Sequence, residues 1–137
     1  MNTRVLVVED NKDLLELLSR TLQFFGFQVT GARNGVDAVA MALSERPAVI
    51  LMDVVMPKMD GLEALSQIRA NPQTREIPVL ALTAWMSPTS REVYRARGFN
   101  DYLAKPFKQE ALLTAIGQLL SDADKQSAAS ELIDRPN

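Results

Sequence analysis

The stretch AVILMDVVMPKMDG, residues 48–61, decides the fold. Its apolar residues 48–52 run without interruption into the carboxylate of Asp53, and a proline and a glycine follow. A run of this kind, bounded by residues that break it, is typical of a strand buried on both faces in the middle of a parallel sheet. We therefore expect Asp53 at the carboxyl end of a central strand, the edge where α/β sheets bind ligands.

The rest of the chain alternates between strand and helix patterns. Short apolar runs predict strands at residues 5–8, 27–30, 48–52, 77–82 and 101–104. Helices are predicted between these strands and after the last one. The first is capped by Asp10-Asn11 and ended by Gly26, and the third is opened by Asp60-Gly61 and broken by Asn71-Pro72. The second spans residues 35–46, the fourth spans 88–97, and apolar residues between 107 and 120 mark the last. This alternation predicts an α/β fold, a doubly wound five-stranded parallel sheet with right-handed crossovers.

The apolar faces of the helices follow from residue spacing. On the first helix the predicted core stripe is Leu14, Leu15, Leu18, Leu22 and Phe25, and on the second it is Val36, Val39, Ala40 and Leu43. The fourth helix offers only Val93 and Ala96, so we expect it to be the least firmly held. Leu17 and Phe24 lie off the first stripe and could form an apolar patch where a partner protein docks; alternatively, Phe24 packs on the last helix.

Composition excludes several functional classes. The chain of 137 residues has 47% apolar and 23% charged residues and no cysteine, which fits one globular domain without disulfides or thiolate metal sites. A net charge of −2 gives no broad basic surface, so we expect no direct nucleic-acid partner. No segment resembles a membrane span or signal peptide, which predicts a cytoplasmic protein without a membrane partner. The chain has no histidine, so any histidine that takes part in its chemistry must belong to another molecule.

Functional groups follow the strands at their carboxyl ends: Glu9-Asp10, Asp53, Thr83 and Lys105. In a parallel sheet these ends share one edge, where three carboxylates would repel one another unless a cation compensates. An all-oxygen set with a few carboxylates suits Mg²⁺. Lys105 and Thr83 could contact the oxygens of a phosphoryl group, and an aspartate can be the nucleophile toward phosphorus.

Taken singly, most of these residues have an ordinary structural interpretation. Asp10 and Thr83 alone would more often be helix caps or turn residues, and Lys105 before a proline would usually be a surface lysine. Asp53 is harder to dismiss, because a carboxylate that ends a buried strand needs partners. The joint pattern favours a functional site.

These motifs resemble the receiver domain of two-component response regulators. The similarity covers residues 4–120 and rests on Glu9-Asp10, Asp53 with Met56-Pro57 and Asp60-Gly61, Thr83-Ala84, and Lys105-Pro106. It implies a flavodoxin-like fold with strand order 2-1-3-4-5. It also implies an Mg²⁺-dependent phosphoacceptor rather than an enzyme, phosphorylated on Asp53 by a histidine kinase or histidine phosphotransfer protein and signalling to a downstream protein target.

The resemblance further implies a role for each site residue. Asp10 and Asp53 would bind the metal directly with the Val55 carbonyl, and Glu9 through water. Lys105 would pair with the phosphoryl group, and Thr83 would move toward it, while Tyr102 would be the switch aromatic and the small Ala84 would leave room for its ring. The receiver domain would span residues 1–121, with a polar tail at 122–137 that is flexible or extends the last helix.

Two residues near the site bear on the lifetime of the phosphoryl group. Val55 and Trp85 each stand two residues beyond a strand-end group and should rim the path of an attacking water. Val55 offers no side-chain hydrogen bond to that water and Trp85 could cover the opening, so we expect slow self-dephosphorylation. The alternative is that both are incidental surface residues.

Other functions on related architectures fit less well. A flavodoxin-like electron carrier needs a phosphate-binding loop where this chain has acidic residues, which would repel a phosphate. A haloacid dehalogenase-type phosphatase carries an acid two residues after its nucleophile, where this chain has Val55. A docking module that acts without phosphorylation remains the alternative, although no acceptor, metal or phosphoryl-contact position is missing.

Overall fold

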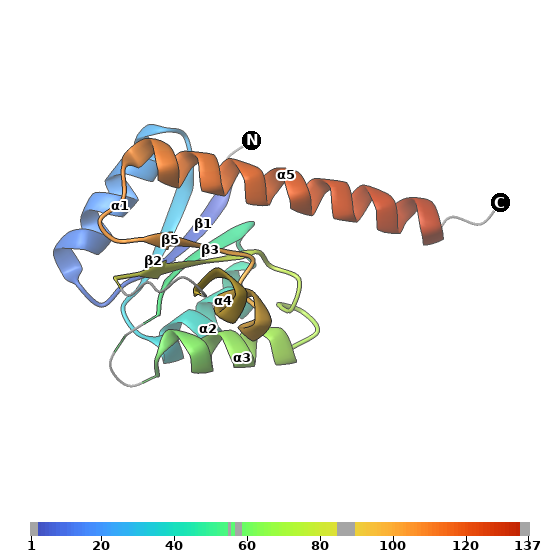
Figure 1. The fold of residues 1–137 in the computed structure, drawn as a ribbon, viewed down its shortest axis with the longest axis horizontal. Coiled ribbons are helices and arrows are strands. Elements are labelled where there is room, and N and C mark those ends of the chain that lie inside the picture. Colours follow the sequence, from blue (N-terminus) through green and yellow to red (C-terminus); the bar gives the residue numbers. More distant parts are fainter. Residues whose placement is uncertain (1–2, 55, 57–58, 85–89, 135–137) are drawn as a thin grey trace.

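The structure is a computed structural model that describes residues 3–54, 56, 59–84 and 90–134. Within these residues strands and helices alternate along the chain (Figure 1): β1 (Arg4–Val8), α1 (Lys12–Phe24), β2 (Gln28–Ala32), α2 (Gly35–Glu45), β3 (Val49–Asp53), α3 (Gly61–Ala70), β4 (Val79–Thr83), α4 (Ser90–Arg97), β5 (Asp101–Ala104) and α5 (Gln109–Asp134). The strand-then-helix order predicted from the sequence is confirmed.

All five strands form one parallel sheet in the order β2-β1-β3-β4-β5. This confirms the predicted doubly wound, flavodoxin-like α/β fold. The central strands β3 and β4 are buried along their whole length, as expected of continuous apolar runs covered on both faces. The edge strand β2 begins and ends later than predicted, because its polar and half-buried residues give a weaker pattern.

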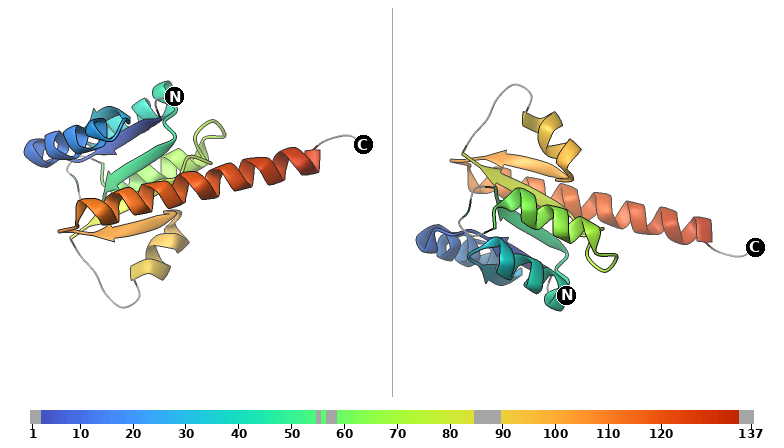
Figure 2. Two further views of the ribbon diagram at one scale, coloured as in Figure 1. Left: turned by 90° about the horizontal axis from the view of Figure 1, so that it is seen from above. Right: turned by 90° about the horizontal axis from the view of Figure 1, so that it is seen from below.

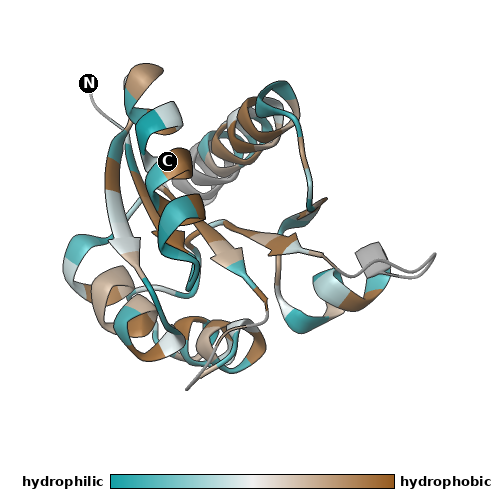
Figure 3. Cartoon of the chain, turned by 90° about the vertical axis from the view of Figure 1, so that its left-hand side faces the viewer, coloured by the Kyte–Doolittle hydropathy of each residue, from teal (hydrophilic) through white to brown (hydrophobic). Residues whose placement is uncertain are grey.

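Helices cover both faces of the sheet (Figures 1 and 2). On one face α1 and α5 pack against the strands through a cluster that includes Leu18, Leu22, Leu112 and Ile116. On the other face lie α2, α3 and α4, and that cluster includes Leu65. Figure 3 shows apolar, brown residues along the central strands and a mixture of teal and brown residues along the helices. The sheet therefore separates two apolar layers.

The predicted apolar face of α2 is right at Val39, which is half-buried and packs against the core, but wrong at Val36, Ala40 and Leu43. Val36 and Leu43 are exposed, and the helix instead buries Gly35, Ala38 and Ala42. A Cβ atom at Gly35 would lie 2.3 Å from the carbonyl oxygen of Met59, which is too close for any side chain. Close packing of α2 therefore selects its smallest residues, whereas the sequence pattern gave weight to the largest.

The predicted face of α1 is right at Leu18 and Leu22, which are buried, but wrong at Phe25. The helix ends one residue earlier, so Phe25 is the C-cap residue and is partly exposed. Gly26 follows with a φ of 94°, a left-handed conformation that favours glycine. Phe24 is 84% exposed, so the alternative that it packs on the last helix is also wrong.

The last helix, α5, is long and projects beyond the sheet (Figures 1 and 2). It continues to Asp134, through most of the segment predicted as a polar tail. The proposed boundary of the receiver domain at residue 121 stays a prediction. In the part of the chain that the structure describes, no helix combines the length and hydrophobicity that crossing a bilayer requires.

Candidate functional site

The carboxyl ends of four strands bring the predicted site residues to one edge of the sheet. Asp53 and Thr83 are the last residues of β3 and β4, and Glu9 and Lys105 directly follow β1 and β5. Neighbouring strands are in parallel register at this edge, with Asp53 opposite Leu82. The fold therefore gathers residues that are far apart in the sequence.

Lys105 forms the electrostatic centre of this edge. Its Nζ donates a hydrogen bond of 2.6 Å to Oε1 of Glu9 and lies 3.3 Å from Oδ2 of Asp53. Burial alone would lower the pKa of Lys105, but its hydrogen bond to Glu9 and the negative charges of Asp53 and Glu9 outweigh this effect, and the pKa is raised. Lys105 is thus held as an ammonium against two carboxylates.

Glu9, Asp10 and Asp53 form a cluster with the composition of a metal site. One carboxylate oxygen of each lies within 4.8 Å of the others. Glu9 is only 1% exposed, and its Oε2 accepts a hydrogen bond of 3.2 Å from the backbone of Asn11. A set of carboxylate oxygens fits a hard cation such as Mg²⁺. The cluster could therefore hold a metal ion, but Val55, the fourth expected ligand, lies outside the described residues.

Gly61 allows the start of α3 to approach Asp53. A Cβ atom at this position would lie 2.6 Å from the Asp53 carbonyl oxygen and 2.8 Å from Cα of Val54. The backbone N–H of Gly61 also donates to the carbonyl of Val54 at 2.8 Å. The sequence indicated Asp60-Gly61 only as a turn; the structure adds that a larger residue would collide with the backbone of the site.

Thr83 is buried and has a partner that the sequence did not indicate. The hydroxyl of Tyr94, on α4, donates a hydrogen bond of 3.1 Å to Thr83 Oγ1. The spacing analysis chose Val93 and Ala96 as the inner face of α4, yet Val93 is exposed and Tyr94 is buried. A large aromatic next to the predicted stripe was the available signal for this residue.

The predicted switch residues lie beside this hydrogen bond. Tyr102 is half-buried on β5, and its ring centroid is 5.8 Å from that of Tyr94. Ala84 is exposed immediately after β4. Trp85, predicted to rim the site with Val55, lies outside the described residues.

Comparisons with known proteins agree with this geometry. A family model described as the response regulator receiver domain matches residues 5–117. The chain is 39% identical over 132 residues to the response regulator MprA of Mycobacterium tuberculosis, covering 96% of this chain and 56% of that protein. It is 42% identical over 120 residues to MprA of Mycobacterium ulcerans, covering 88% and 51%. The chain thus spans about half the length of these curated relatives.

Solved structures with the same fold include close matches in size. The receiver domain of the sensor histidine kinase PA1611 from Pseudomonas aeruginosa, solved with a magnesium ion coordinated in its active site cleft, has a TM-score of 0.81 at 36% identity, covering 88% of this chain and 99% of that one. The chemotaxis protein CheY4 of Vibrio cholerae gives 0.81 at 35%, covering 87% and 99%. From its sequence match and its fold, this chain belongs to the response regulator receiver domains of two-component systems.

Proposed function

We propose that the protein accepts a phosphoryl group on Asp53 from the phosphohistidine of a histidine kinase or histidine phosphotransfer protein. The observation that carries this proposal is the convergence of Asp53 with two further carboxylates and Lys105 at one sheet edge. A carboxylate oxygen of Asp53 would attack phosphorus, and the phosphorus–nitrogen bond would break with its electron pair left on the imidazole. The product would be an aspartyl phosphate.

The reaction would require Mg²⁺, which when bound offsets the negative charge of the carboxylates and of the phosphoryl oxygens. Asp10 and Asp53 would be direct ligands together with the carbonyl of Val55, and Glu9 would act through a water. Lys105 would exchange its contact with Asp53 for a phosphoryl oxygen, an exchange supported by its ammonium lying 3.3 Å from Oδ2 of Asp53.

The signal would leave through a surface change rather than through catalysis on another substrate. Thr83 would move toward the phosphoryl group, with Ala84 and Tyr102 as neighbouring switch positions. The equilibrium between two positions of α4 would shift, because the contact between Thr83 and the phosphoryl group is made in only one of them. The downstream protein target would recognise this change.

The phosphodonor would dock on α1. Leu17 and Phe24 are 62% and 84% exposed, large values for apolar side chains. They stand seven residues apart on one line of the helix, away from the buried residues Leu18 and Leu22. An apolar patch of this kind is a candidate contact for a partner protein.

Intact-mass analysis tests phosphorylation. After incubation with acetyl phosphate and Mg²⁺, the parent should gain one phosphoryl group, and Asp53→Asn should gain none. Asp60→Asn is the matched control, because Asp60 caps α3 and asparagine caps equally well. Equal labelling of Asp53→Asn would contradict the assignment, and absence of labelling from both acetyl phosphate and a phosphorylated donor protein would favour a docking module that acts without phosphorylation.

A further inference from the structure

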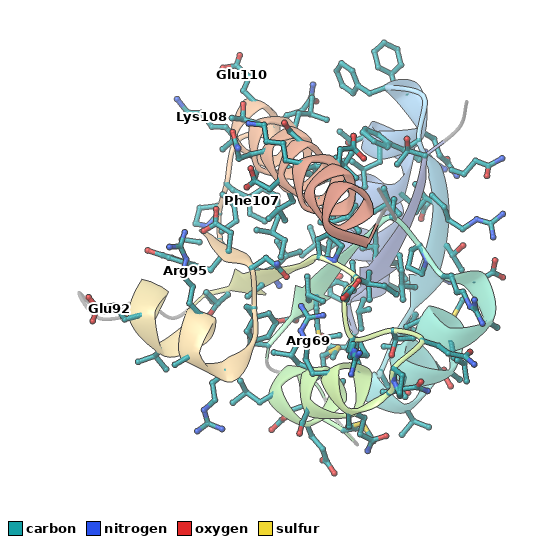
Figure 4. All side chains as sticks on the ribbon, turned by 90° about the vertical axis from the view of Figure 1, so that its right-hand side faces the viewer. Arg69, Glu92, Arg95, Phe107, Lys108 and Glu110 are labelled. Carbon is teal, nitrogen blue, oxygen red and sulfur yellow. The ribbon has the colours of Figure 1, made fainter. Side chains whose placement is uncertain are left out.

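Helix α4 contacts the rest of the protein through its inner side. Tyr94 is buried there, edge-on to Phe99 with ring centroids 5.8 Å apart and an interplanar angle of 89°. On the outer side Glu92 projects away from the sheet (Figure 4), and Val93 and Arg95 are also exposed. The position of α4 therefore depends strongly on Tyr94.

The carboxyl end of α4 is fixed by Arg69 from α3. Its Nε and Nη2 donate to the carbonyl oxygen of Gly98 at 3.0 and 2.9 Å, and Nη2 also donates to Oδ1 of Asn100 at 2.8 Å. Nη1 donates to the carbonyls of Arg75 and Ile77 at 2.8 and 2.7 Å. Burial lowers the pKa of Arg69, consistent with a guanidinium enclosed by backbone and amide oxygens. This end of α4 is thus joined to the start of β4 and β5.

A hydrogen bond from Tyr94 to Thr83 joins the middle of α4 to the site. The bond is buried, so water competes for neither hydroxyl there. This bond directly connects Thr83, which is proposed to contact the phosphoryl group, with α4, which is proposed to change position. No intermediate side chain is needed for that connection.

We propose that Tyr94 is a positioning residue that holds Thr83 in its unphosphorylated position and holds α4 against the sheet. This inference rests on the proposed function, in which Thr83 Oγ1 turns toward the phosphoryl group. Because Gly98 is fixed by Arg69, α4 cannot follow Thr83 as a whole, and the bond to Tyr94 breaks. Phosphorylation then releases the middle of α4 while its carboxyl end stays in place.

The Tyr94→Phe variant tests this role, since it keeps the ring and removes one hydroxyl. Loss of a hydrogen bond that exists only in the unphosphorylated conformation should change the equilibrium constant between the two conformations by about fivefold, in favour of the phosphorylated one. Beryllofluoride with Mg²⁺, a phosphoryl mimic, should therefore bind Tyr94→Phe about fivefold more tightly than the parent. In a Thr83→Val background the same substitution should leave the affinity unchanged, because the acceptor is already absent.

Equal or weaker beryllofluoride binding by Tyr94→Phe in the parent background would overturn the proposal, because the bond would then persist or strengthen in the bound state. An equal gain in the Thr83→Val background would also overturn it, because the effect would not pass through Thr83.

Amide exchange of the untreated protein gives a second readout that does not depend on phosphorylation. The α4 amides of Tyr94→Phe should exchange about fivefold faster than those of the parent, while the amides of α2 stay unchanged as an internal control. If the parent fails to bind beryllofluoride, the proposed function fails. The rate of amide exchange in α4 then decides alone whether Tyr94 holds the helix. Unchanged α4 exchange would then overturn the role of Tyr94, and faster exchange confined to α4 would support it.

Discussion

Replacing Lys105 by methionine removes the positive charge at the centre of the acidic edge while keeping an unbranched side chain of similar length. Without metal, Glu9 and Asp53 would lose the ammonium that lies 2.6 and 3.3 Å from their oxygens. Because Glu9 is almost completely buried, water cannot easily replace that partner. We expect Lys105→Met to be less stable than the parent in the absence of Mg²⁺.

The distances set the size of this loss. At an effective dielectric constant of about 20, the gross Coulomb attraction is roughly 6 kcal/mol for the pair with Glu9 and roughly 5 kcal/mol for the pair with Asp53. Desolvation of the three groups cancels most of that attraction, and the side chain of Lys105 remains 21% exposed. The net loss in the free energy of unfolding should be about 2 to 3 kcal/mol.

Urea unfolding followed by circular dichroism measures this loss, with Lys108→Met as the matched control because Lys108 is exposed. At about ten times its dissociation constant Mg²⁺ should stabilise the parent by roughly 1.4 kcal/mol. At the same Mg²⁺ concentration Lys105→Met should gain more, because no ammonium competes for the carboxylates. The reasoning is refuted if Lys105→Met is as stable as Lys108→Met, or if Mg²⁺ stabilises the parent and Lys105→Met equally.

The pH dependence has a definite sign. The pKa of Lys105 is raised above its ordinary value of 10.5, so its contribution to stability is fully present below about pH 10.5 and is lost as the pH rises through the folded-state value. The stability difference between the parent and Lys105→Met should therefore stay constant near neutral pH and shrink only in strongly alkaline solution.

Two further predictions concern the partner surface and the lifetime of the phosphoryl group. Leu17→Ser should slow phosphoryl transfer from the partner protein while acetyl phosphate still labels the chain at the parent rate, and equal slowing of both reactions would count against docking at Leu17. Replacing Val55 by Asn and Trp85 by Glu should speed loss of the phosphoryl group about tenfold, or roughly 1.4 kcal/mol of barrier, when the remaining phosphoprotein is followed by mass; an unchanged lifetime would show that these residues do not control water access.

The sheet and the placement of the site residues could be predicted because they depend on continuous patterns. The apolar run before Asp53 is buried on both faces in β3, and parallel strands necessarily bring their carboxyl ends to one edge. The inner faces of α2 and α4 could not be predicted in the same way. On α2 the requirement for close approach selects Gly35 and Ala38, which a search for large apolar residues passes over.

Contacts between distant elements were the other part that the sequence did not reveal. The hydrogen bond between Tyr94 and Thr83 depends on how α4 is rotated against β4, and no spacing within α4 encodes that rotation. Gly61 is similar, because its need for a hydrogen side chain comes from the backbone of Asp53 and not from the turn alone.

Under the proposed function, the shallow attachment of α4 would separate recognition of the downstream target from the chemistry at the acidic edge. Glu92, Val93 and Arg95 are exposed, so substitutions among them should change the free energy of unfolding by no more than about 0.5 kcal/mol. The acidic edge and the inner side of α4 lie elsewhere and need not change at the same time. A duplicated copy of this gene could then acquire a new target through a few surface substitutions on one short helix, while inheriting the acidic edge unchanged.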